Sequence, residues 1–184
     1  FLLVLILAGL SLLVTYYVQP YLPSSFTDRQ YLGIHTSLEL VSIFVSFTIF
    51  VLIWLLREGL DDYQGSIILF LGINFFAVGL FDLLHTLSYE GMPHIIAQSS
   101  SHNSTVFWLI ARYWVALSFL GALLGVRFKV NPRKTTKFYL LANVAIIALT
   151  FILVMRFPEM IPPLYIEGVG LTPIKVQLEF GLIL

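Results

Sequence analysis

Long apolar runs separated by short polar segments dominate the chain. A transmembrane helix needs about 20 predominantly apolar residues. Five segments meet this requirement: residues 1–18, 32–56, 66–88, 105–126 and 138–155. A sixth apolar helix is expected from Pro173 to Leu184. The pattern predicts an all-α fold, a polytopic transmembrane helical bundle with about six helices visible and truncated at both ends, in which residues 1–184 form a single domain.

Loop charge predicts the orientation of these helices. The loop 127–137 carries several basic residues, whereas the loop 89–104 has no Lys or Arg. Loops rich in Lys and Arg tend to stay in the cytoplasm. We therefore expect the loops 57–65 and 127–137, and the N-terminus, to be cytoplasmic.

Composition agrees with a membrane protein and narrows the chemistry. The chain is 59% hydrophobic and 11% charged, with a mean hydropathy of +0.94, whereas soluble domains have about a quarter charged residues. The formal net charge is zero, so no basic surface indicates a nucleic-acid partner. The absence of cysteine excludes disulfides, thiolate metal sites and iron–sulfur clusters within this sequence.

Four ionisable residues interrupt two of the apolar segments. His35 and Glu39 lie one turn apart in the first, and Asp82 and His85 lie near the end of the second. Charged groups at membrane depth are costly and usually mark function. The two helices are antiparallel and joined by a short loop, so they are expected to be neighbours. Counting turns from the outer ends places His35 level with His85 and Glu39 level with Asp82, which predicts one shared site.

These four side chains suit several kinds of site. Imidazole and carboxylate together favour a divalent metal such as Zn, Fe, Cu or Mn. Alternatively, His35 and His85 could ligate the iron of haem b from two sides, with the acids around them. In a purely structural interpretation, Glu39 and Asp82 bond to the histidines or to Arg112 and lock the bundle together.

Other charged residues are candidates for ligand binding. Arg112, in "FWLIARYW", lies at the expected depth of Glu39 and Asp82 and would form either a salt bridge or a clamp on an anionic ligand. Lys175 and Glu179 have the spacing of a helix-surface ion pair, and with Glu167 and Arg112 they form the candidate ligand-binding set. No motif for phosphate binding, serine hydrolysis or protein kinase activity occurs in the chain.

Four stretches carry a family resemblance: "HTSLELVSIF", "FLGINFFAVGLFDLLHTLSYEGMP", "FWLIARYW" and "YIEGVGLTPIKVQLEF". In these the chain resembles the third type of the bacterial membrane-associated sensor (MASE) domains. The resemblance implies a multi-helix input module of the inner membrane that is not itself an enzyme. It also implies a cytoplasmic output part, missing from this sequence, of PAS domains followed by a histidine kinase or a diguanylate cyclase.

The leading functional hypothesis is therefore a sensory input domain. It would bind a metal, haem or a small ligand on the outer side and transmit its state to two-component or cyclic di-GMP signalling, as a homodimer by analogy with its signalling class. The alternatives are a haem-binding redox or electron-transfer subunit, a small-solute transporter, and a purely structural assembly partner. No inverted repeat supports the transporter.

Overall fold

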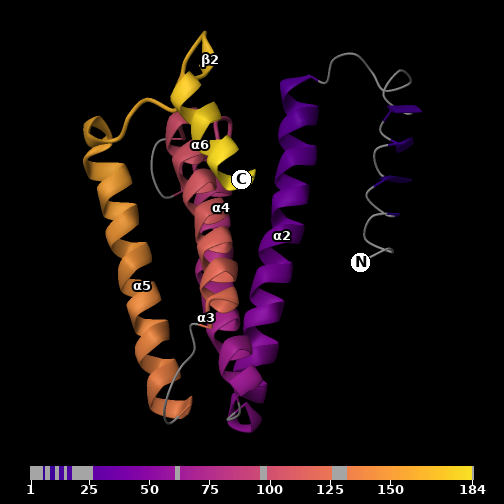
Figure 1. The fold of residues 1–184 in the computed structure, drawn as a ribbon. Helices are drawn as coiled ribbons and strands as arrows, with labels where there is room; N and C mark the ends of the chain where they lie inside the picture. Colours follow the sequence, from indigo (N-terminus) through magenta and orange to yellow (C-terminus); the bar gives the residue numbers. More distant parts are fainter. Residues whose placement is uncertain are drawn as a thin grey trace. The chain divides into compact units, whose positions relative to one another are not determined.

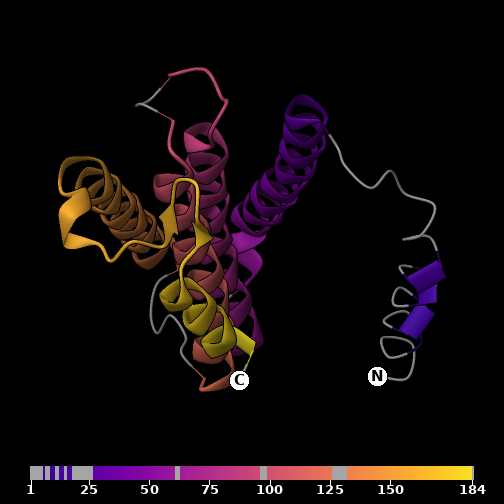
Figure 2. The ribbon, with the colours of Figure 1, turned by 90° about the horizontal axis from the view of Figure 1, so that it is seen from above.

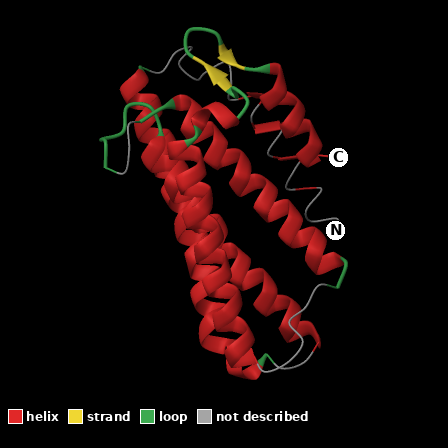
Figure 3. Ribbon diagram, turned by 90° about the vertical axis from the view of Figure 1, so that its left-hand side faces the viewer, coloured by secondary structure: helices red, strands yellow, loops and turns green. Residues whose placement is uncertain are grey.

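The computed structural model describes residues 6, 9, 10, 13, 14, 16, 17, 27–60, 63–95, 99–125 and 132–183. The chain forms two compact units, residues 1–35 and residues 36–184. The described parts are almost entirely α-helical (Figure 3), which confirms the predicted helical class. The count of about six helices is not confirmed, because the predicted helix 1–18 lies mostly outside the described residues. The residues of that segment that are described are helical.

Five helices are described, each close to a predicted segment. They are α2 (Asp28–Leu56), α3 (Tyr63–Ser88), α4 (Ser101–Leu123), α5 (Pro132–Arg156) and α6 (Pro173–Ile183). A short 3₁₀ turn, η2 (Arg57–Gly59), follows α2. The sixth predicted helix is confirmed from its first residue. The first four helices begin a few residues before the predicted starts, because hydrophobic runs mark buried turns and not capping residues.

The capping residues show why these helices begin early. The Thr27 hydroxyl accepts from the Gln30 amide at 3.3 Å, and the Gln30 side chain accepts from the Thr27 amide at 3.0 Å. This reciprocal pair is a capping box. Ser100 caps α4 by accepting from the Asn103 amide. Pro132 is the first residue of α5, a position where its missing N–H costs nothing.

Helices α2 to α5 are long and apolar enough to cross a membrane. Their candidate spans are Arg29–Gly59, Gln64–Ser88, Ser101–Leu123 and Thr136–Arg156. In Figure 1, α3 and α4 run side by side, with α5 along one flank. The outward faces carry exposed Leu, Ile, Val and Phe side chains, as contact with lipid requires. The predicted membrane-spanning character is thus supported for four helices.

Helix α3 is the centre of the larger unit. Leu69, Ile73, Ala77 and Phe81 are almost completely buried and recur every four residues, so they lie along one face of the helix. Phe107 of α4 is also fully buried, in the same cluster as Ala77 and Phe81. Packing of this continuous apolar face holds α3 between its neighbours and fixes the positions of its polar residues.

Two small residues let α2 approach α3 closely. A Cβ atom added at Gly72 would lie 2.6 Å from Cγ2 of Ile53, and one added at Gly79 would lie 3.2 Å from the ring of Phe47. At Gly72 a side chain would displace Ile53, whereas at Gly79 the Phe47 ring would have to give way by a few tenths of an ångström. Both glycines therefore serve helix packing, as small residues often do in membrane bundles.

A short hairpin connects α5 to α6. The 3₁₀ turn η3 (Pro158–Met160) comes first. The hairpin itself consists of two paired antiparallel strands, β1 (Tyr165–Ile166) and β2 (Gly170–Leu171). The Pro/Gly-rich sequence predicts no long helix here, but it does not predict this strand pair.

The start of α6 is fixed to this connection. The Thr172 amide and hydroxyl both donate to the carbonyl of Leu164, at 3.1 and 3.4 Å. The same hydroxyl accepts from the Lys175 amide at 3.4 Å. Leu164 is itself buried in the core, so the first turn of α6 is held by the core of the unit.

Candidate polar cluster between helices α2, α3 and α4

Asp82 is the centre of a polar cluster inside the bundle. Its side chain has no exposed surface. Nη2 of Arg112 on α4 donates to Oδ1 of Asp82 at 2.5 Å, and Oγ of Ser42 on α2 donates to Oδ2 at 3.3 Å. One carboxylate therefore links three helices. Its charge is compensated inside the apolar bundle, as a buried charge requires.

His85 lies one turn further along α3 with its ring held by α4. Its Nδ1 lies 2.8 Å from the backbone carbonyl of Ser104. A carbonyl can only accept, so Nδ1 carries a proton. In the neutral ring the lone pair is then on Nε2, which lies 3.8 Å from Oε1 of Glu39 on α2. This separation exceeds that of a hydrogen bond, and both side chains are largely buried.

The pairing between α2 and α3 differs from the predicted one by about a turn. Glu39 faces His85 and Ser42 faces Asp82, so the prediction that Glu39 lies level with Asp82 is wrong. The prediction counted turns from the ends of apolar runs, whereas α2 begins at its capping box. His35 belongs to the N-terminal unit, where its ring stacks on Tyr31 with centroids 5.7 Å apart.

Arg112 forms the salt bridge that was one of its two predicted roles. Its side chain is 34% exposed, and its Cζ atom lies 5.9 Å from the centroid of the Trp108 ring. Since α4 begins at Ser101, Arg112 lies about three turns, or about 16 Å, from the start of the helix, and about two turns from Thr105, where the apolar segment was predicted to begin.

Lys175 and Glu179 form the expected ion pair within α6, with Nζ 2.6 Å from Oε1. The pair is not a simple surface feature. Lys175 is buried, and its Nζ lies 4.9 Å from the ring centroid of Trp108 on α4. Glu167 is exposed in the turn between β1 and β2, and none of the described contacts joins it to the cluster.

A family comparison decides what kind of protein this is. The model of the MASE3 membrane-associated sensor domain matches residues 26–184. The chain belongs to the MASE3 family of membrane-associated sensor domains. No curated protein and no solved structure shows a significant match to it. The resemblance seen in the sequence is thus confirmed, and a sensor domain is not itself catalytic.

Two polar contacts between helices of the MASE3 domain were not predicted from the sequence. Nε1 of Trp114 on α4 donates to Oδ1 of Asn74 on α3 at 2.9 Å. Asn74 is a polar residue within an apolar helix, but an indole N–H in an aromatic run gives no hint of its partner. The carbonyl of Ser104 is a backbone group, so no residue pattern could have indicated that it orients His85.

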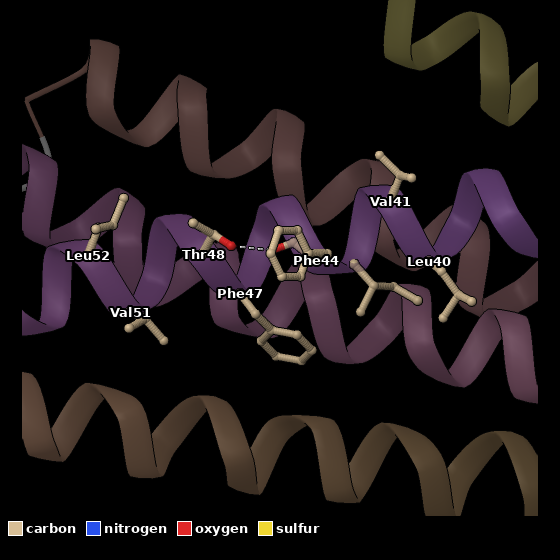
Figure 4. A pocket seen from close by; sticks show the side chains of 8 residues that line it. Leu40, Val41, Phe44, Phe47, Thr48, Val51 and Leu52 are labelled. Atoms are coloured by element: carbon tan, nitrogen blue, oxygen red, sulfur yellow. Dashed lines mark hydrogen bonds between the residues drawn. The ribbon is translucent and has the colours of Figure 1, made fainter.

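The exposed face of α2 is almost entirely apolar. A hollow of about 740 Å³ runs along this helix, lined among the described residues by Ile43 and the side chains labelled in Figure 4. Thr48 is its one polar side chain, and its hydroxyl donates to the Phe44 carbonyl at 2.7 Å. With no ionisable group, this face suits lipid contact and offers no binding chemistry.

The charges of the polar cluster define what it can bind. Asp82 and Arg112 neutralise each other, which leaves the Glu39 carboxylate facing a histidine ring whose Nδ1 proton is already used. Two groups that both present electron pairs repel each other unless a positive charge lies between them. The cluster therefore favours a cation or a proton at the position between Nε2 of His85 and Oε1 of Glu39.

Proposed function

We propose that this chain is the sensory input domain of a bacterial signalling protein and that it binds a divalent metal ion through His85 and Glu39. Its state would pass to a cytoplasmic output part, a histidine kinase or a diguanylate cyclase with PAS domains. The observation that carries this proposal is the orientation of His85, whose Nδ1 is held by the Ser104 carbonyl while Nε2 faces Glu39.

This orientation is the one that metal-binding histidines usually have. Such histidines donate the second ring N–H to a carbonyl or carboxylate, which fixes the tautomer and aims the other nitrogen at the ion. Two ligand atoms on a tetrahedral zinc ion lie about 3.4 Å apart, given bond lengths near 2.0–2.1 Å. The 3.8 Å between His85 Nε2 and Glu39 Oε1 requires only a small closure to reach this value.

Asp82 and His35 were also predicted to be metal ligands. Asp82 is engaged by Arg112 and Ser42, so it positions the helices and does not ligate the ion. His35 stands four residues before Glu39 in the continuous helix α2. Because His35 belongs to the other compact unit, its role as a ligand stays a prediction from this spacing.

Signal transmission follows from differential binding. A metal that binds one arrangement of α2 and α3 better than another shifts the population toward the first. We further propose that the domain lies in the inner membrane with a cytoplasmic N-terminus, that the metal enters from the outer side, and that the full protein acts as a homodimer.

Metal analysis of the detergent-purified protein tests the binding step. We expect about one Zn, Fe, Cu or Mn ion per chain, lost in His85→Ala and reduced in His35→Ala. His94→Ala is the matched control, because His94 accepts from the Ser99 amide in the loop between α3 and α4. A haem absorption band lost in His85→Ala would favour haem b and the redox alternative. Failure of the wild type to bind any of these metals would refute the metal site.

A response assay tests the sensory role separately. In the full-length protein, addition or chelation of the metal should change output activity. His85→Ala should abolish that response while the protein still inserts in the membrane. A normal response in this variant would contradict the proposal, and metal-dependent solute flux in proteoliposomes would favour the transporter.

A further inference from the structure

A second site lies on the other side of Arg112, between α4 and α6. A groove of about 570 Å³ is lined by Trp108, Arg112 and Ala116 of α4 and by Val176, Glu179 and Phe180 of α6, among others. This volume is typical of small-molecule sites. Both views of the ribbon show α6 lying against α4 (Figures 1 and 2).

The groove has one polar end and an apolar body. The polar end consists of Arg112 and Glu179, and the rest of its lining is aliphatic or aromatic. A guanidinium has five N–H donors, and Nη2 of Arg112 is directed to Asp82 while a third of the side chain is exposed. An occupant therefore needs an apolar body and a head group that accepts hydrogen bonds.

The charge balance favours a neutral head group over an anion. Arg112 is paired with Asp82, and Glu179 is paired with Lys175, so the four formal charges cancel. An anionic head would face two carboxylates whose cations are already engaged. A carbonyl oxygen can accept from the guanidinium without adding charge to this apolar region.

The depth of Arg112 then separates two sources of such a carbonyl. Arg112 lies about 10 Å beyond Thr105, where the apolar part of α4 begins, and therefore well inside a hydrocarbon core that is about 30 Å thick. The ester carbonyls of phospholipids lie at the membrane surface, whereas an isoprenoid quinone can carry its carbonyl head into the core. We propose that this groove binds a membrane quinone, with one carbonyl accepting from Arg112 and the body lying between α4 and α6.

Occupancy of the groove bears directly on α6. The Tyr113 hydroxyl of α4 donates to the Leu178 carbonyl of α6 at 2.8 Å, and a Cβ at Gly181 would lie 3.0 Å from the same hydroxyl. The two helices are thus in close contact beside the groove, and a quinone between them would change their separation. Only this effect on signalling depends on the proposed sensory role, because the binding step stands without it.

The test measures binding of a short-chain benzoquinone to the protein in phospholipid nanodiscs. Quinones quench tryptophan fluorescence, and Trp108 lines the groove. We expect saturable quenching in the wild type. Ala116→Leu fills the groove and should weaken binding by about tenfold or more. Ala148→Leu, the same change at an exposed position of α5, should bind as the wild type does.

Three outcomes would overturn the proposal. The first is unsaturable quenching, and the second is equal quinone binding by Ala116→Leu and the wild type. The third is that an alkylbenzene of the same length, which lacks the carbonyl, competes for the groove as well as the quinone does. A phospholipid that copurifies with the wild type and is lost in Ala116→Leu would assign the groove to a lipid. Metal content is measured on the same samples, so failure of the metal site and failure of the quinone site are distinguished.

Discussion

Two ion pairs in this domain differ in how they are built. Asp82 and Arg112 lie on different helices, and the carboxylate is completely buried. Lys175 and Glu179 lie one turn apart in α6, and the carboxylate is 31% exposed. The first pair forms only when α3 and α4 come together, whereas the second can form within one helix before any packing occurs.

This difference shows where charge contributes to the fold. A buried charge that loses its partner is strongly destabilising, whereas pairs four residues apart on a helix contribute little. The interhelical pair therefore specifies how α3 and α4 meet. The pair in α6 neutralises Glu179 and holds Lys175 over Trp108, so its main effect is on the groove and not on stability.

The largest effect is expected from Asp82→Ala. Removal of the carboxylate leaves the Arg112 guanidinium without its counterion and Ser42 without its acceptor. We expect a loss of about 3 kcal/mol, at the low end for a buried pair because a third of Arg112 is exposed. Thermal unfolding in detergent measures this loss. The double variant Asp82→Ala/Arg112→Met should be less destabilised than Asp82→Ala, and a double variant that is worse would contradict this account.

A smaller effect is expected from Trp114→Phe. This change removes the neutral hydrogen bond to Asn74 between the same two helices, and such bonds contribute about 1 kcal/mol. The same unfolding assay applies. Adding Asn74→Ala to Trp114→Phe should cost less than Asn74→Ala costs alone, because the shared bond is already lost. Strict additivity would show that the bond contributes nothing.

The smallest effect is expected from Glu179→Gln. This change removes the negative charge of the pair, but the amide oxygen that replaces the carboxylate oxygen can still accept from the buried Lys175 ammonium, which also stays close to the Trp108 ring. Stability should therefore change by only about 0.5 kcal/mol. A loss as large as that of Trp114→Phe would mean that the ion pair of α6 also holds helices together. The Asp82–Arg112 pair would then not be the only one of the two with that role.

The sequence predicts the helices of this domain better than it predicts their polar partners. Apolar runs locate α2 to α6 because each must bury or expose a continuous hydrophobic surface. Asp82, His85 and Arg112 stand out because charge is rare at membrane depth. Their partners depend on the relative shift of neighbouring helices, which the predicted ends do not fix to within one turn, and on the backbone carbonyl of Ser104.

The β1–β2 pair was not predicted for a related reason. Two strands of two residues are too short for an alternating pattern to be recognised. Gly168 and Gly170, which adopt positive φ angles of 76° and 99°, signal a turn without indicating what it joins. Glu167, one of the predicted ligand-binding residues, lies exposed in this turn.

Because the start of α6 is held by Thr172, a tilt of this helix has its pivot at Thr172. The contact of Leu178 with Tyr113 lies about 9 Å from that pivot, and the far end at Ile183 lies about 16 Å away, at 1.5 Å per residue. If α6 turns as a rigid rod, a displacement at Leu178 is nearly doubled at Ile183. A change of about 0.7 Å in the spacing of α4 and α6 at Leu178 would thus become a movement of about 1.2 Å at the end of α6.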